Sequence, residues 1–261
     1  MRLIDFDARF TQYLHTWMEA HANEYQSLNE MEQEVPNVFL AFINTPAEWL
    51  DDISPGAYFT QFDDGKDLVD WLVLYSKNNM SIPSLLIDRI IEVGLPCEKR
   101  LLLVIKDSQV PREARMVAIA ILREMESTAP KAFYCHYLET LEQADDISEN
   151  IIESLHQMGP AAVKPLTDIL FRATPAGQDA ILDVLVNYPC SEKTLKLLIT
   201  KFVSNPDKRA LYAAYLGKLG DERALDPLIE AASDAALPYH DYIEIRCAVE
   251  RLGGEAPIRF F

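Results

Sequence analysis

The sequence predicts an all-α fold in which antiparallel helical hairpins stack into an α-α superhelix, or solenoid. The stretch 205–233 is typical of two short amphipathic helices joined by a tight turn. Comparable turn residues recur every 30 to 33 residues through residues 81–261. A single hairpin of this kind cannot bury its apolar face, so neighbouring hairpins are expected to stack on it.

The stretch 205–233 is the clearest of these hairpins. Asn205 is a natural N-cap for its first helix. Gly220 can end that helix in a left-handed conformation, and Asp221 can then cap the second helix. Pro227 would bend the second helix unless that helix begins late. Because the turn is short, the two helices are expected to be antiparallel.

This stretch resembles the HEAT-like repeats, in particular the subclass named after phycobilisome lyases. The matching residues are Asp207, Arg209, Ala213, Leu216, Gly217, Leu219, Gly220, Asp221, Ala224, Leu225, Pro227, Leu228 and Ile229. The resemblance implies a HEAT-like solenoid over residues 81–261. It implies no chromophore chemistry, because in such repeats the matched residues form turns and cores.

The period extends the prediction to the other repeats. Turns between helices are expected at Gly94, Glu126, Gly159, Pro189, Gly220 and Gly253. The expected helices are 83–93 with 97–106, 111–125 with 130–141, 147–158 with 160–171, 175–186 with 191–202, 206–219 with 221–233, and a final helix 239–252. This amounts to about five and a half repeats. A non-repetitive helical bundle is the alternative.

Residues 1–80 are predicted to form a separate helical unit. They contain 14 Asp or Glu against 4 Lys or Arg, and 13 of the 25 aromatic residues. A long amphipathic helix is expected from Asp7 to about Glu34, with an end or a bend before Pro36. Short turns around Trp49 and a helix over 66–76 should follow. Since the end of a solenoid must be shielded from water, we interpret this unit as an N-terminal cap.

The composition restricts the classes of partner. A net charge of −17 disfavours binding to nucleic acid or to an anionic membrane, since both require a positive field. No apolar run approaches the about 20 residues of a membrane span, and the N-terminus has no signal-peptide core, so a cytoplasmic location is expected. The cysteines lack Cys-x-x-Cys spacing and are interpreted as reduced core residues: Cys97, Cys135, Cys190 and Cys247.

The sequence contains no motif typical of catalysis. It has no Gly-rich phosphate loop, no Gly-x-Ser-x-Gly elbow and no His-Glu-x-x-His motif. Glu153 and His156 have the spacing of a di-iron ligand pair, but the pair occurs once, and His240 with Glu244 supplies only two ligands. The deoxyhypusine hydroxylases are HEAT-like enzymes with repeated His-Glu dipeptides, which are absent here. We therefore predict no catalytic residues, no metal site and no cofactor.

These observations favour a non-enzymatic intracellular scaffold that binds another protein along the concave face of the solenoid, formed by its second helices. The alternative is an enzyme or cofactor-binding protein with a site between the N-terminal unit and the solenoid. An aromatic-lined closed pocket with convergent polar groups would favour the alternative, and an open groove the scaffold.

Candidate binding residues come from a local reversal of charge. Five basic residues and one acidic residue lie between Lys193 and Arg209. We expect Lys193, Lys196 and Lys201 on the side of their helix opposite the core, joined by Lys164 from the preceding repeat. Such a patch would bind an acidic segment of a partner, or the chain's own acidic N-terminal unit. Alternatively, these lysines are simply solvated surface residues.

Overall fold

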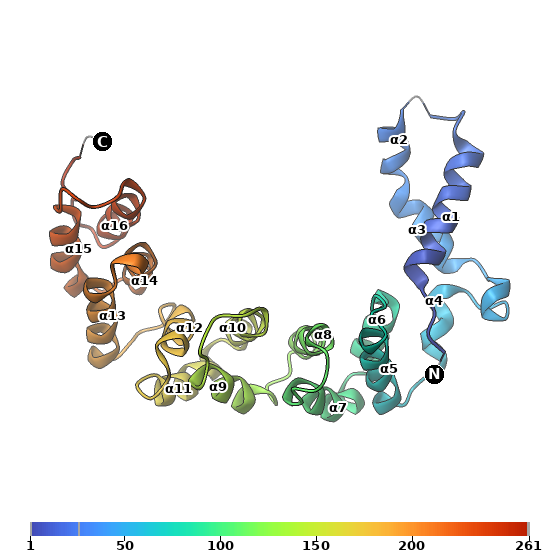
Figure 1. Cartoon of the computed structure of the whole chain (residues 1–261), viewed down its shortest axis with the longest axis horizontal. Coiled ribbons are helices and arrows are strands. Elements are labelled where there is room, and N and C mark those ends of the chain that lie inside the picture. Colours follow the sequence, from blue (N-terminus) through green and yellow to red (C-terminus); the bar gives the residue numbers. More distant parts are fainter. Residues whose placement is uncertain (1, 26, 260–261) are drawn as a thin grey trace. The chain divides into compact units, whose positions relative to one another are not determined.

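The computed structural model of the chain describes residues 2–25 and 27–259 (Figure 1). Over these residues the fold is all-helical, and the one β-type pairing is an isolated bridge between Ala47 and Ile53. The predicted fold class is therefore confirmed. None of the described helices has the length and apolar character needed to cross a membrane. The chain divides into two compact units, residues 1–130 and 131–261.

The first unit begins with helices that differ in length and spacing from the repeats. They are α1 (Phe6–His21), α2 (Leu28–Gln33), α3 (Val35–Asn44), the 3-10 turn η1 (Glu48–Leu50), α4 (Pro55–Tyr58), the 3-10 turn η2 (Phe59–Gln61) and α5 (Gly65–Lys77). The short turn around Trp49 and the helix expected over 66–76 are both present. The prediction of one helix from Asp7 to Glu34 is wrong, because α1 ends at His21.

A competing helix start explains this break. The apolar spacing continues through the break, but the Ser27 side chain accepts a hydrogen bond from the backbone N–H of Glu30 at 3.3 Å. Ser27 thereby caps a new helix, α2. The boundary expected near Pro36 is present, since α2 ends at Gln33 and α3 carries Pro36 in its first turn.

The N-terminal segment is fastened to α5 by two aromatic side chains. The Tyr75 hydroxyl accepts a hydrogen bond from the N–H of Ile4 at 3.1 Å and donates to its carbonyl at 3.0 Å. The Trp71 indole N–H donates to the carbonyl of Arg2 at 3.2 Å. Tyr75 is fully buried, and Phe6, Phe42, Phe59 and Trp71 are also buried, so these members of the aromatic set are core residues.

The first repeat helices belong to the same compact unit as α5. They are α6 (Ser84–Val93), α7 (Leu95–Lys106) and α8 (Arg112–Glu124). A Cβ at Gly65 would lie 2.6 Å from the carbonyl carbon of Pro96, so α5 and the start of α7 approach very closely. Arg100 on α7 also pairs with Asp70 on α5 at 2.5 Å. The predicted boundary at residue 80 falls inside this unit, and the division into 1–80 and 81–261 stays a prediction.

The second unit consists of two layers of repeat helices. Its helices are α9 (Lys131–Glu139), α10 (Asp146–Met158), α11 (Pro160–Ile169), α12 (Pro175–Leu185), α13 (Glu192–Ser204), η3 (Pro206–Lys208), α14 (Arg209–Leu219), η4 (Glu222–Ala224), α15 (Leu225–Ala232) and α16 (Tyr239–Arg251). Within this unit, α10, α12, α14 and α16 follow one side, and α9, α11, α13 and α15 follow the other (Figure 1). The first helices of successive repeats thus share a face.

Backbone geometry supports the predicted period. Positive φ angles occur at five of the six predicted turn positions: Gly94, Glu126, Gly159, Gly220 and Gly253. The sixth position is Pro189, whose ring fixes φ at a negative value. Positive φ ends a helix and reverses the chain, which is what the loop between antiparallel helices requires.

The hairpin at 205–233 differs from the prediction at its start. Asn205 does not cap with its side chain, which instead donates a hydrogen bond to the carbonyl of Lys201 at 2.8 Å. Asp221 accepts from the N–H of Arg223 at 3.1 Å, as a cap should. Because α15 begins only at Leu225, Pro227 lies in its first turn, where its missing N–H breaks no hydrogen bond within the helix.

The cysteines divide by burial. All four are free thiols. Cys97 and Cys135 are buried, and burial raises the pKa of both thiols, that of Cys97 to about 11. Cys190 is half-buried and Cys247 is exposed. The interpretation as core residues is therefore wrong for Cys247.

Candidate functional site

The four lysines predicted to bind a partner have different environments. Lys164 on α11 and Lys193 on α13 are exposed, as expected. Lys196 is also exposed and pairs with Glu192 one turn earlier at 2.6 Å. Lys201 is buried, with its side chain 10% exposed, so its expected place on the solvent side of α13 is wrong.

Helix geometry accounts for the position of Lys201. At about 100° per residue, Lys201 lies roughly 60° from Leu198, at the edge of the buried stripe. Lys193 and Lys196 lie more than about 130° from Leu198 by the same count, and they are exposed. Thr194, which is also buried, lies on the same flank of this stripe about 40° from Leu198. The group predicted as one patch therefore contains one residue that stabilises the fold.

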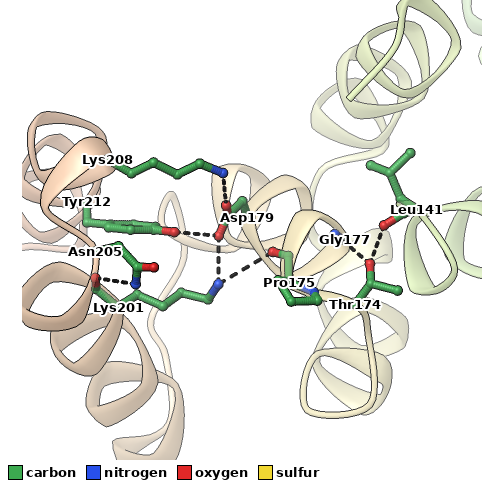
Figure 2. Close-up of polar contacts among 9 residues, drawn as sticks. All are labelled: Leu141, Thr174, Pro175, Gly177, Asp179, Lys201, Asn205, Lys208 and Tyr212. Atoms are coloured by element: carbon green, nitrogen blue, oxygen red, sulfur yellow. Dashed lines mark hydrogen bonds and ion pairs between the residues drawn. The ribbon is translucent and has the colours of Figure 1, made fainter. Parts of the chain in front are cut away.

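Asp179 on α12 is the partner of Lys201 (Figure 2). The Lys201 ammonium donates to this carboxylate at 2.8 Å and reaches the carbonyl of Pro175 at 3.5 Å. Lys208 donates to the other carboxylate oxygen at 2.8 Å, and the Tyr212 hydroxyl donates to the first oxygen at 2.9 Å. Asp179 thus connects α12 to α13 of its own hairpin and to η3 and α14 of the next one.

The electrostatics of Asp179 follow from these contacts. Burial alone would raise the pKa of its carboxyl, because the charged form loses hydration. Hydrogen bonds from Lys201, Lys208 and Tyr212 outweigh that effect and hold the pKa below its usual value. The pKa of Tyr212 is raised, first by burial and then by its bond to Asp179. The carboxylate is therefore charged and the phenol neutral across the neutral pH range.

A second carboxylate on α12 lies one turn further along. Asp183 is bonded to Nε2 of His156 on α10 at 2.9 Å. Burial, followed by the charge and hydrogen bond of Asp183, raises the pKa of Tyr215 on α14. The two acids of α12 therefore join the helices on both of its sides in the first-helix layer. His156, considered above as a metal ligand, is engaged with this carboxylate, and the described residues contain no cluster of three metal-ligating side chains.

The start of α12 is fixed against the repeat before it. Thr174 caps α12 by accepting from the N–H of Gly177 at 3.0 Å, and its hydroxyl donates to the carbonyl of Leu141 (Figure 2). Its own N–H donates to the carbonyl of Glu139 at 3.1 Å. A Cβ at Gly177 would lie 2.0 Å from the carbonyl oxygen of Leu138, so no other residue permits this approach. The position of Asp179 relative to α9 and its following loop is thereby set.

An open pocket of about 440 Å³ lies among α10, α12 and α14, on the first-helix side of the second unit. Apolar side chains from α10 and α14 form part of it, including Ile152, Leu211 and Tyr215. Charged lining residues are Glu142, Glu149, Asp179, Asp183 and Lys208. We expected a binding groove along the second helices of the repeats, whereas this pocket lies among the first helices α10, α12 and α14. Lys164, Lys193 and Lys196 do not line it.

Sequence reasoning missed Asp179, Asp183, Tyr212 and Tyr215. One signal was available, because Asp179 and Asp183 lie one turn apart on the face that also carries Ala176 and Ala180. Small residues beside two acids indicate a face that a neighbouring helix approaches. The lysines have the stronger sequence signal, because their charge contrasts with the net charge of −17 of the whole chain.

The all-helical fold is that of a helical repeat protein, a kind often used for protein interaction. Residues 213–234, which include the end of α14, the turn at Gly220 and α15, match the family described as PBS lyase HEAT-like repeat. The match covers this segment alone and confirms the resemblance noted for residues 205–233. A search of curated proteins found no significant match.

Proposed function

We propose that the protein is a non-enzymatic scaffold that binds another protein on the first-helix face of its second unit. The pocket among α10, α12 and α14 is the observation that supports this most directly. It is open, it combines apolar and charged lining residues, and its walls are held by the bonds of Asp179 and Thr174. Such a preorganised surface binds without first having to be ordered.

The chemistry of the pocket suggests which part of a partner enters it. Leu211 is 38% exposed at this surface, although it is apolar. Glu142 and Glu149 are also exposed and lie at the same pocket. An apolar side chain next to a basic group would fit both features, since aliphatic contacts give affinity and opposite charges orient the approach.

The lysines retain a separate part of the proposal. Lys164, Lys193 and Lys196 are exposed on second helices, where an acidic segment could contact them. Lys196 already has Glu192 as a neighbour, which reduces its attraction for a further anion. Lys201 is buried and is therefore not part of this group. The cytoplasmic location, the exclusion of nucleic acid and the enzyme alternative remain expectations from the sequence.

Photo-cross-linking from single positions tests the proposed function. A photoreactive amino acid replaces Leu211 in the pocket or, as the matched control, Val203 on α13, which is also apolar and is 59% exposed. After irradiation in cells of the source organism, we expect a discrete protein adduct from the Leu211 position and none at that mass from the Val203 position. Equal adducts from both positions, or none from Leu211, would contradict a binding site in the pocket.

A further inference from the structure

A second binding surface lies in the first unit, between α1 and the segment that follows α3. A hollow of about 410 Å³ is lined there by Arg9, Tyr13, Phe42 and Trp49. A neighbouring hollow of about 350 Å³ shares Arg9 and Trp49 and extends to Arg2. Because the two share these side chains, they form one continuous surface, called here the Arg9 groove and defined by these five residues.

Aromatic rings give the Arg9 groove a fixed apolar wall. The rings of Phe42 and Trp49 are stacked with centroids 6.5 Å apart, and Tyr13 lies 5.4 Å from Phe42. Phe42 is buried, and Trp49 also contacts the buried Phe6 at 6.0 Å. Rings held by such contacts present apolar area with little loss of side-chain entropy on binding.

Arg9 supplies the charge of the groove. Its guanidinium carbon lies 5.1 Å from the centroid of the Trp49 ring. Stacking of this kind uses the face of the guanidinium and leaves its N–H groups available for an oxygen ligand. In the described part of the chain, no carboxylate forms an ion pair with Arg9.

The location of the two arginines is unusual for this region. Residues 1–80 carry 14 acidic and 4 basic side chains, and Arg2 and Arg9 are two of those four. The acidic side chains at the groove are Glu48 and Asp5. Asp5 is occupied as the cap of α1, where it accepts from the N–H of Ala8 at 2.8 Å. Glu48 repels a uniformly acidic ligand, so apolar groups must provide much of the contact.

We propose that the Arg9 groove binds a peptide segment of a partner protein in which carboxylate side chains alternate with aromatic or aliphatic ones. The carboxylate would accept paired hydrogen bonds from Arg9, as guanidinium and carboxylate geometries match. The apolar side chains would pack on Tyr13, Phe42 and Trp49. This surface belongs to the first unit, so the inference does not depend on the pocket of the second unit.

The test uses the full-length chain and the synthetic peptide acetyl-Leu-Glu-Phe-Glu-Leu-amide. Binding is measured by calorimetry and by the NMR shift of the Trp49 indole N–H. We expect saturable binding that weakens as salt rises, and a loss of affinity of about tenfold or more in Arg9→Gln, as for a charge-assisted hydrogen bond. Lys66→Gln is the matched control, because Lys66 is an exposed cation of the same unit, 71% exposed, and should leave affinity unchanged.

Further probes separate the alternatives. The basic analogue acetyl-Leu-Lys-Phe-Lys-Leu-amide should not bind, and phenylacetate should bind much more weakly than the acidic peptide. Arg9→Lys keeps the charge without the planar fork and should give an intermediate affinity. The proposal is overturned if the acidic peptide fails to bind, binds Arg9→Gln equally, or leaves the Trp49 signal unmoved. It is equally overturned if phenylacetate binds as tightly, because the groove would then be a small-acid site.

Discussion

The N-terminal helices and the repeats of the second unit are stabilised by contacts of different range. Around α1 and α5, buried hydrogen bonds join residues far apart in sequence, such as Tyr75 to Ile4, which are separated by 71 positions. In the second unit, Asp179 reaches partners 22 to 33 positions away, in its own hairpin and in the next one. A repeat therefore contacts only its neighbours along the chain, whereas the N-terminal helices form a small core from segments that are distant in sequence.

The strongest test of this comparison is to remove Asp179. In Asp179→Ala the Lys201 ammonium would remain buried without a carboxylate, which typically costs about 3–5 kcal/mol. We expect a corresponding loss in the free energy of unfolding of the second unit, measured by urea titration. Hydrogen exchange should rise in α12, α13 and α14 before it rises in α1 and α5, because the contacts of α1 and α5 do not involve Asp179.

Two variants control for other causes. Glu192→Gln removes an exposed pair on α13 and should change stability little, since both of its side chains are hydrated. The double change Asp179→Leu with Lys201→Met should recover much of the loss, because an apolar pair can replace a buried ion pair. If Asp179→Ala unfolds no more easily than Glu192→Gln, Asp179 does not connect the repeats energetically.

The repeat region could be predicted from sequence because its signals are local. The turn at Gly159 and the late helix start before Pro227 depend on residues within one hairpin. The break after His21 was missed because apolar spacing continued across it, while the deciding cap came from a single serine, Ser27. A side-chain cap of this kind starts a new helix by a single hydrogen bond to the backbone, but a single serine is a weak signal in the sequence.

The candidate site was predicted less well than the fold. Lys193 and Lys196 were placed correctly on an exposed face, because helix geometry alone decides that. The burial of Lys201 depends on Asp179 on the first helix of the same hairpin, and no periodicity within α13 indicates that partner. Side-chain pairing between repeats requires the packed structure, and the pocket among α10, α12 and α14 follows from it.

A second test uses pH. The pKa of Asp179 is held below its ordinary value of 3.8, because hydrogen bonds to the charged form outweigh the effect of burial. A depressed pKa contributes stability that is present above the ordinary value and is lost as the pH falls through the folded value. We expect thermal stability of the second unit to fall below pH 3.8 more steeply in wild type than in Asp179→Leu with Lys201→Met. Parallel pH profiles would contradict this linkage.

The corresponding test in the N-terminal helices is Tyr75→Phe. It leaves the buried N–H of Ile4 without its partner, at a cost of about 1–3 kcal/mol, while the Ile4 carbonyl keeps the hydrogen bond that it accepts from the N–H of Phe6 at 3.1 Å. Hydrogen exchange should rise first in α1 and α5 and not in α12. Burial raises the pKa of Tyr75 from 10.0 to about 12, so its contribution is complete below pH 10.0 and is lost as pH rises through about 12. Wild type should therefore lose more stability than Tyr75→Phe on alkaline titration. If the difference in free energy of unfolding between the two proteins stays constant as the pH rises, the Tyr75 hydroxyl does not stabilise the N-terminal helices in this way.

The smallest effect is expected at two equivalent turns, one in each unit. Glu126 has a φ of 53°, a conformation that costs a side-chain-bearing residue about 1–2 kcal/mol. Glu126→Gly removes this cost but adds freedom to the unfolded chain, so a stabilisation of at most about 1 kcal/mol is expected.

Gly220, at a φ of 73°, offers the reverse change: a Cβ there would meet no atom within 4 Å, so Gly220→Ala tests backbone conformation alone. Chemical denaturation should give opposite signs for the two variants. A destabilising Glu126→Gly would mean that the Glu126 side chain has contacts of its own, and the two turns would then not be equivalent.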